Sequence, residues 1–352
     1  MHNFDYSKIW QRALTPDVVA LLTKIHEYKV RQVLFADSKA DTLTQLLDMA
    51  KIQSADASNK IEGIFTSDDR LKKIVNDKTH PRNRNEREIA GYREVLSTIR
   101  ESYAYVPFKP NMILQLHQNL YKYSGTTLSG RFKVSDNVIV EVDDYGNETV
   151  RFIPMETGAT PQAVDDLCLA FENILKDGEV EPLIIIPMAI LDFLCIYPFN
   201  EGNGRMGRLL TLLLLYQTGY TVGKYISIEK LIEQSKETYY ETLQQSSYGW
   251  HENENDYLPF IRFMLGVILK AYKEFFERTE LLTMKGVSKP DRVAATIKNT
   301  LGKITKTEIL KRCPDVSEIT VQRTLAELLN KGDIIKIGGG RYTQYVWNRE
   351  KD

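Results

Sequence analysis

The sequence contains no hydrophobic run long enough to cross a membrane. Its longest apolar stretch, Leu209–Tyr216, is interrupted by Thr211 and falls well short of the ~20 residues that a transmembrane helix needs. The N-terminus also lacks the basic region and apolar segment of a secretory signal. We therefore expect a cytoplasmic protein with no membrane partner.

Cysteine and histidine are scarce. The three cysteines, Cys168, Cys195 and Cys313, are odd in number and far apart, and the five histidines form no pair at helical spacing. A disulfide framework and a metal site built from Cys and His are therefore not expected.

Charge is balanced overall but not along the chain. The formal net charge is −1, yet the segment from Lys285 to Asp352 holds 14 Lys/Arg against 8 Asp/Glu. The rest of the chain is correspondingly acidic, which predicts two parts with different surfaces.

Helical periodicity dominates residues 1–283. Leu43, Leu46, Leu47 and Ala50 show the spacing of one helix face. Further expected helices are Asp165–Lys176, Leu183–Ile196, Arg205–Gln217, Ile228–Gln244 and Tyr257–Thr279. The fold class is thus mainly α.

Two segments depart from this helical pattern. Between Phe132 and Ile153, β-forming residues flank the turn Asp143–Asn147, which predicts a hairpin. After a linker at Gly286–Pro290, three short helices and a closing hairpin predict a small winged-helix domain. Such a domain could bind DNA, mediate dimerisation or serve as a structural appendage.

The stretch Tyr197–Arg208 carries the chemistry. Gly202, Asn203 and Gly204 precede an apolar helix, whose first-turn N–H groups are unpaired and whose dipole is positive at that end. Small residues let those donors approach a phosphate closely. Arg205 and Arg208, three residues apart, are expected on one helix face, where each can chelate phosphate oxygens.

Three other interpretations of this stretch are weaker. A solvated glycine turn with two surface arginines explains each residue singly but not the set. Gly202-x-Gly204-x-x-Gly207 has the spacing of a dinucleotide fingerprint, but no strand precedes it within a βαβ unit. A P-loop is excluded because no Gly-Lys-Ser/Thr follows.

The stretch resembles the signature of the Fic family, His-x-Phe-x-Asp/Glu-Gly-Asn-Gly-Arg-x-x-Arg, at every fixed position from Phe199 to Arg208. Resemblance over most of residues 40–280 implies a Fic-type helical bundle with a β-hairpin flap. The corresponding division is an N-terminal helical region at 1–110, a Fic core at 111–283 and the winged-helix domain at 284–352.

Fic proteins transfer AMP from ATP to a hydroxyl of a target protein, and the resemblance implies roles for residues of this chain. Glu201 would hold Mg²⁺, and Tyr240 would lie against adenine unless it is an ordinary core tyrosine. ATP and phosphate would be bound by Gly202, Asn203, Gly204, Arg205, Met206, Gly207, Arg208 and Tyr240, with Arg208 at the γ-phosphate and Arg205 also assisting catalysis.

Tyr197 replaces the histidine that the family uses as general base. A phenol with a pKa of ~10 cannot readily accept a proton at neutral pH. Tyr197 could disable transfer, could have its pKa lowered by Arg205 and Arg208, or could leave a background activity that another residue, such as His117, supports.

Ser58 and Glu62 belong to a second motif, Ser-Asn-Lys-Ile-Glu-Gly. Glu62 near a helix end could be an ordinary exposed residue before a stop, but the family's inhibitory motif is Ser/Thr-x-x-x-Glu-Gly/Asn. The resemblance implies that Glu62 pairs with Arg208 and keeps it from the γ-phosphate.

Two functions are thus expected. The first is an autoinhibited protein adenylyltransferase that uses ATP and Mg²⁺ and modifies a target protein or itself. The second is a catalytically impaired ATP-binding regulator whose winged helix binds DNA or protein, with a homodimer as one arrangement.

Overall fold

The computed structural model describes residues 2–7, 9–38, 40–142, 148–176, 178–283, 288–298, 300, 303–340 and 343–348. The chain divides into two compact units, Met1–Lys273 and Glu274–Asp352. Within the described part, none of the helices combines the length and apolar character that a membrane span requires.

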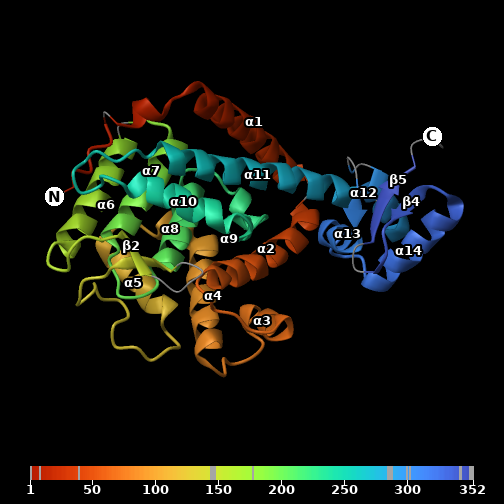
Figure 1. Cartoon of the computed structure of the whole chain (residues 1–352), viewed down its shortest axis with the longest axis horizontal. Coiled ribbons are helices and arrows are strands. Elements are labelled where there is room, and N and C mark those ends of the chain that lie inside the picture. The colour runs from red at the N-terminus through yellow and green to blue at the C-terminus, as the bar shows by residue number, and fades with distance from the viewer. Residues whose placement is uncertain are drawn as a thin grey trace. The chain divides into compact units, whose positions relative to one another are not determined.

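The first unit is a helical bundle with one hairpin (Figure 1). Its helices are α1 (Pro16–Ser38), α2 (Ala40–Ile61), α3 (Asp68–Val75), α4 (Arg84–Ser102), α5 (Pro110–Leu120), α6 (Thr160–Lys176), α7 (Pro182–Ile196), α8 (Asn203–Gln217), α9 (Ile228–Gln234), α10 (Lys236–Ser247) and the part of α11 (Leu258–Thr283) up to Lys273. Short 3₁₀ turns lie at Trp10–Ala13, Tyr103–Tyr105 and Val222–Lys224. The mainly α fold class is confirmed.

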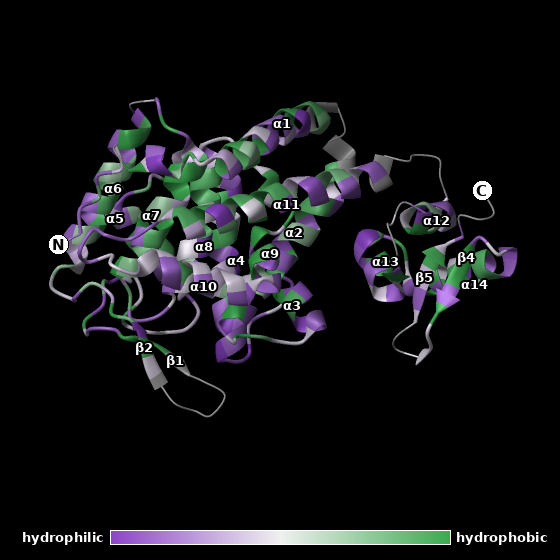
Figure 2. Ribbon diagram, turned by 45° about the horizontal axis from the view of Figure 1, so that its top comes forward, coloured by the Kyte–Doolittle hydropathy of each residue, from purple (hydrophilic) through white to green (hydrophobic). Residues whose placement is uncertain are grey.

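Two adjacent helices, α7 and α8, form the centre of this bundle. Nearly every residue of α7 and of α8 up to Tyr216 is buried, as expected of helices that are apolar on all sides. In Figure 2 the interior helices, α7 among them, are mostly hydrophobic, whereas hydrophilic residues gather on outer elements such as α3. The loop 197–202 that joins α7 to α8 is therefore held between two rigid supports.

The predicted helix over 228–244 is wrong in one respect, because it is two helices. The break falls at Ser235, whose backbone leaves the helical region (φ −125°, ψ 37°). Its hydroxyl donates to the carbonyl of Leu231 at 2.9 Å, a local bond that competes with helix continuation. The break changes the direction of the chain just before Tyr239 and Tyr240.

The hairpin consists of β1 (Ile139–Val142) and β2 (Glu148–Phe152), which pair antiparallel. Its predicted turn, Asp143–Asn147, lies outside the described residues. The register shifts between Ile139 and Val140, so β2 contains a bulge beside the pocket described below.

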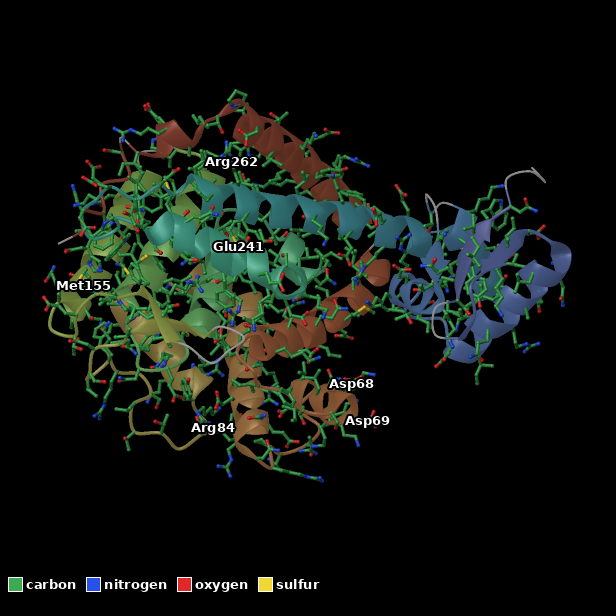
Figure 3. All side chains as sticks on the ribbon, in the orientation of Figure 1. Asp68, Asp69, Arg84, Met155, Glu241 and Arg262 are labelled. Carbon is green, nitrogen blue, oxygen red and sulfur yellow. The ribbon has the colours of Figure 1, made fainter. Side chains whose placement is uncertain are left out.

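Ion pairs and one buried carboxylate tie the outer elements to this bundle. Arg262 of α11, labelled in Figure 3, forms two hydrogen bonds of 2.7 and 3.0 Å with Asp17 of α1. Asp192 of α7 is fully buried and accepts from Tyr6, Trp250 and Tyr257 at 2.6–2.8 Å. Asp192 thus joins the N-terminal segment, α7 and the loop before α11.

Removing the Asp192 carboxylate is expected to destabilise the first unit strongly. Asp192→Ala leaves three buried donors without their acceptor, each at about 1–3 kcal/mol, so we expect a loss of at least ~3 kcal/mol in the free energy of unfolding. Urea unfolding followed by circular dichroism measures it. Asp17→Ala removes an exposed ion pair and is the matched control, with a much smaller expected loss. Equal losses for the two variants would contradict this role.

The second unit contains α12 (Lys289–Lys298), β3 (Ile304–Thr305), α13 (Lys306–Arg312), α14 (Glu318–Lys331), β4 (Ile334–Ile337) and β5 (Gln344–Trp347). Its antiparallel sheet has the order β3-β5-β4. The unit has a core of its own that includes Val293, Ile309, Val321 and Ile334. Of the predicted linker, 286 and 287 lie outside the described residues. The winged-helix interpretation and the boundaries at 110 and 284 stay predictions.

Candidate active site

The site begins where α7 ends. Tyr197 caps this helix in the left-handed conformation (φ 52°, ψ 62°), and its N–H donates to the carbonyl of Phe193. Few residues other than glycine adopt this conformation, which turns the chain sharply into the loop 198–202. Gly202 (φ 86°) closes the loop as the N-cap of α8. An added Cβ there would stand 3.0 Å from the ring of Tyr121. Both the positive φ and the lack of space therefore favour glycine at this position.

The side chain of Asn203 holds this loop together. Its Oδ1 accepts from the N–H of Phe199 at 2.9 Å, and its Nδ2 donates to the carbonyl of Phe199 at 2.7 Å. Both polar atoms of the Asn203 side chain thus bond to the Phe199 backbone. What remains for a ligand is the start of α8, where the first bond within the helix is donated by Met206 to the carbonyl of Gly202 at 2.9 Å. The N–H groups before it lack helical partners.

Two residues outside the motif also position the loop. His117 stacks on Phe199 with ring centroids 3.7 Å apart, accepts from the N–H of Gly130 at 3.0 Å and faces the carbonyl of Glu201 at 3.0 Å. Lys133 is buried and donates to the carbonyls of Met155 and Ile196. Sequence reasoning missed Lys133, since nothing local marks a lysine that caps a distant helix.

His117 is not available as a base. Both ring nitrogens face backbone groups, with Nδ1 accepting and Nε2 therefore donating. Burial, with a smaller contribution from the positive charge of Arg205, lowers the pKa of His117 to about 4. The hypothesis that His117 supports a background activity is thus not favoured by its contacts.

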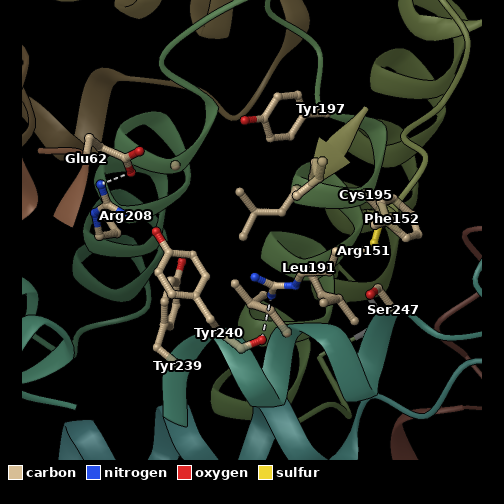
Figure 4. Close-up of a pocket in the computed structure, with 14 residues that line it drawn as sticks. Glu62, Arg151, Phe152, Leu191, Cys195, Tyr197, Arg208, Tyr239, Tyr240 and Ser247 are labelled. Atoms are coloured by element: carbon tan, nitrogen blue, oxygen red, sulfur yellow. Dashed lines mark hydrogen bonds and ion pairs between the residues drawn. The ribbon is translucent and has the colours of Figure 1, made fainter. Parts of the chain in front are cut away.

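Arg208 is buried, and its guanidinium is bound by both residues of the second motif. It donates to Glu62 Oε1 at 2.7 Å, to Ser58 Oγ at 2.8 Å and to the Ser58 carbonyl at 2.9 Å. Figure 4 shows the contact between Glu62 and Arg208 at one end of a pocket. The pairing implied by the resemblance is present, and its inhibitory effect stays a prediction.

The helix that presents Ser58 and Glu62 is fixed along its length. Ser54 of α2 donates to buried Glu229 at 2.8 Å, and Tyr92 of α4 donates to the same carboxylate at 2.9 Å. At the C-terminus of α2, Lys236 donates to the carbonyl of Ile61 at 2.9 Å. Burial would raise the pKa of Glu62, but Arg208, helped by Arg205 and Lys236, holds it below the usual value. Glu62 is therefore an anion at neutral pH.

Arg205 has a different environment from the one expected. It pairs with buried Glu88 at 2.8 Å and donates to Tyr121 at 2.8 Å, and it is absent from the pocket lining that the structure describes. Helical spacing places the two Cβ atoms on similar sides, but long side chains can diverge toward different carboxylates. In this conformation Arg205 joins α8 to Glu88 of α4 and to Tyr121, and it does not face the pocket.

Glu201 lies at the exposed tip of the loop. Its carboxylate is 3.3 Å from Arg84 of α4, which also pairs with Glu88 at 2.9 Å; Arg84 is labelled in Figure 3. Within the described residues, no group of three His, Cys, Asp or Glu side chains is arranged to hold a metal alone. A cation here would need ligands from a bound substrate.

A pocket opens beside Arg208, between α7, α8, α10 and the hairpin (Figure 4). It is lined by Glu62, Ile139, Arg151, Phe152, Leu191, Leu194, Cys195, Tyr197, Gly204, Arg208, Tyr239, Tyr240, Leu243 and Ser247. Tyr240, Gly204, Arg208 and Tyr197 of the expected site thus meet here. Met206 is fully buried, and Gly207 packs against Leu194. Sequence reasoning missed Arg151, because a single arginine in a strand carries no signal.

Tyr197 is a neutral phenol in this setting. Burial raises its pKa, and the negative charge of Glu62 raises it further, against a smaller lowering by the Asn203 side chain. The hypothesis that nearby arginines lower the pKa of Tyr197 is therefore wrong. Glu62 already neutralises Arg208, and Glu88 already pairs with Arg205.

Gly204 provides a test of how closely Glu62 fits. A Cβ on Gly204 would collide with Glu62 Oε1, so Gly204→Ala should displace that carboxylate and lower the free energy of unfolding. In a Glu62→Gly background the collision is gone. A double-mutant cycle of urea unfolding is expected to give a coupling of about 0.5–3 kcal/mol between the two positions. Simple additivity of the two changes would contradict this geometry.

The fold and the site define a helical protein with a glycine-containing turn at the N-terminus of a buried helix. Residues 107–215 match the model of the Fic/DOC family, so the chain contains a Fic/DOC family domain.

Two curated relatives carry Fic or Fido in their names. The chain is similar to protein adenylyltransferase Fic of Aedes aegypti (32% identical over 145 residues, 39% of this chain and 27% of the relative). A Fido domain-containing protein of Dictyostelium discoideum is 24% identical over 152 residues, covering 42% of this chain and 96% of that protein. The match spans only about a quarter of the mosquito relative's length.

Solved structures share the fold. A Fic family protein from Desulfovibrio desulfuricans G20 superposes with a TM-score of 0.62 at 20% identity, covering 96% of this chain and 97% of the other. Fic-1 from C. elegans gives a TM-score of 0.56 at 17% identity, covering 74% and 72%.

Proposed function

We propose that this chain is a Fic-type protein adenylyltransferase held in check by Glu62, with a weakened proton-transfer step at Tyr197. One observation carries the proposal: buried Arg208 stands beside Gly204 at the N-terminus of α8, in a pocket that an acidic side chain of the same protein occupies. A guanidinium beside unpaired N–H groups is suited to bind a polyphosphate, and Glu62 takes the place of that anion.

In the proposed reaction, a protein hydroxyl attacks the α-phosphorus of ATP. A bond forms between the hydroxyl oxygen and phosphorus, the bond to the β-phosphate oxygen breaks, and pyrophosphate leaves with the electron pair. The hydroxyl proton needs an acceptor. Tyr197 lines the pocket but is a neutral phenol, so the proton goes to solvent or to the departing phosphate, and the step is slow.

Glu201 fits the role of the Mg²⁺ ligand. It is an exposed carboxylate at the loop tip, with 64% of its side chain accessible, and Mg²⁺ usually takes one or two protein carboxylates with the remaining ligands from phosphates and water. Bound there, the ion would neutralise phosphate charge. Arg84 supplies the opposing charge at this carboxylate and would yield to the metal.

The proposal is tested by the position of the label. The double variant Glu62→Gly, Tyr197→His should transfer radioactivity to itself or to a lysate protein from ATP labelled at the α-phosphate but not at the γ-phosphate. Arg208→Ala in the same protein should abolish the signal. Transfer from the γ-label would indicate phosphorylation instead, and absence of transfer from the α-label in the Glu62→Gly, Tyr197→His double variant would contradict AMP transfer.

A second candidate is an ATP-binding regulator that does not turn over. The raised pKa of Tyr197 favours this second candidate, because a neutral phenol cannot act as the general base and does not interfere with ATP binding. In that case the second unit would bind DNA or a protein partner, or pair with a second copy. Binding to DNA would weaken steeply with salt as counterions are released, which an anisotropy titration would detect.

A further inference from the structure

Arg151 is turned into the pocket by the β-bulge of the hairpin. Ile139 pairs with Phe152 and Val140 with Val150, so Arg151 has no partner on β1. Val150 points outward and is 62% exposed, whereas Arg151 and Phe152 both line the pocket. A regular strand would alternate these side chains between its two faces. Bulges next to active sites often redirect a side chain in this way.

The guanidinium of Arg151 lies on Tyr240. Its Nη2 donates to the Tyr240 carbonyl at 2.6 Å, and its Cζ is 5.1 Å from the centroid of the Tyr240 ring. Figure 4 shows this contact away from Glu62 and Arg208. In the described part of the chain, no carboxylate forms an ion pair with Arg151, in contrast to Arg208. The contact therefore combines a cation–π interaction with the Tyr240 ring and a hydrogen bond to the Tyr240 backbone.

The two ends of the pocket differ in chemistry. Glu62, Gly204 and Arg208 form a charged end suited to phosphates. Phe152, Leu191 and Cys195 lie on the same side of the pocket as Arg151 (Figure 4). Apolar walls do not suit a phosphate, but they suit a planar heterocycle. Tyr240 connects the ends, because its hydroxyl is near Glu62 and Arg208.

We propose that Arg151 and Tyr240 are the two walls between which the nucleobase stacks, with the Arg151 guanidinium on one side and the phenol ring on the other. A planar guanidinium stacks on aromatic faces as well as forming hydrogen bonds. A base between them would stand at the usual stacking distance of ~4.5–7 Å from the Tyr240 centroid, the place that Arg151 now takes. Binding therefore moves Arg151, and the strand that carries it, outward by the thickness of one ring.

This inference rests on the proposed nucleotide site, and the experiment separates the two. Calorimetry in a Glu62→Gly background compares ATP with inorganic tripolyphosphate, which has the phosphates but no base. Arg151→Ala is expected to weaken ATP binding by about 10-fold or more, the effect of a desolvated cation–π contact, and to leave tripolyphosphate within about twofold. Arg151→Lys, which keeps the charge but not the planar group, should give an intermediate loss.

Arg131→Ala, an exposed arginine in the loop before the hairpin, is the matched control and should change neither affinity. Thermal unfolding of each variant verifies that it is folded. Equal weakening of both ligands by Arg151→Ala would place Arg151 on the phosphates and overturn the inference, as would unchanged or tighter ATP binding. If the Glu62→Gly protein bound neither ATP nor tripolyphosphate, both the proposed function and this inference would be contradicted.

Discussion

In a Glu62→Gly background, replacing Tyr197 with histidine is expected to raise AMP transfer by roughly 10²–10⁴-fold, the usual contribution of a positioned general base. At pH 7 the phenol is neutral because burial and Glu62 raise its pKa, whereas histidine titrates near pH ~6.5. The backbone accepts the change, since Tyr197 has a φ of 52° and histidine is among the residues enriched at positive φ. The measurement is the initial rate of incorporation from α-labelled ATP.

The control for this prediction is Tyr197→Phe, which keeps the ring and removes the hydroxyl. If the phenol takes no part in proton transfer, phenylalanine and tyrosine should give equal low rates. A rate for phenylalanine tenfold below that of tyrosine would instead show that the hydroxyl contributes to the reaction. Comparing all three proteins in a Glu62→Gly background keeps nucleotide binding constant.

Replacing Glu62 with glycine is expected to tighten ATP binding by about 10–100-fold. In the structure Glu62 makes a charge-assisted hydrogen bond to Arg208 at 2.7 Å, and such bonds contribute about 1.5–3 kcal/mol, with each 1.4 kcal/mol equal to a tenfold change in affinity. Once Glu62 is removed, Arg208 keeps its bonds to Ser58 and is left positively charged in a buried site. A phosphate then replaces the lost carboxylate. Calorimetric titration with ATP measures the change.

Two further variants test whether the charge of Glu62 causes the inhibition. Glu62→Gln keeps the shape of the side chain but not its charge, so it should release most of the inhibition if the ion pair is responsible. Glu179→Gly removes an exposed glutamate from the loop before α7 and should leave affinity unchanged. Equal affinities for ATP in wild-type protein and in Glu62→Gly would show that Glu62 does not inhibit ATP binding.

The parts of the site that the sequence could predict are those that are local in the chain. Phe199 to Arg208 form one loop and one helix turn, so their shared role follows from spacing alone. The contact of Glu62 with Arg208 joins residues 146 positions apart. Only the resemblance to a family with a known inhibitory motif could indicate that contact.

Three features depended on tertiary structure and were not predictable. Arg205 turns to Glu88 because α4 places a buried carboxylate there. Arg151 faces the pocket because a bulge in the hairpin changes the alternation of the strand. The pKa of Tyr197 rises because its phenol is buried and faces the negative charge of Glu62. Each outcome is set by neighbours that are distant in sequence.

The most direct test is the rate of label transfer from α-labelled ATP in four proteins: wild type, Glu62→Gly, Tyr197→His and the double variant. If the nucleotide site is intact, Glu62 inhibits it and Tyr197 cannot act as a general base, transfer should be low in the first three proteins and strong in the fourth. Transfer by Glu62→Gly alone as fast as by the double variant would contradict this account, because Tyr197 would then impose no barrier to proton transfer.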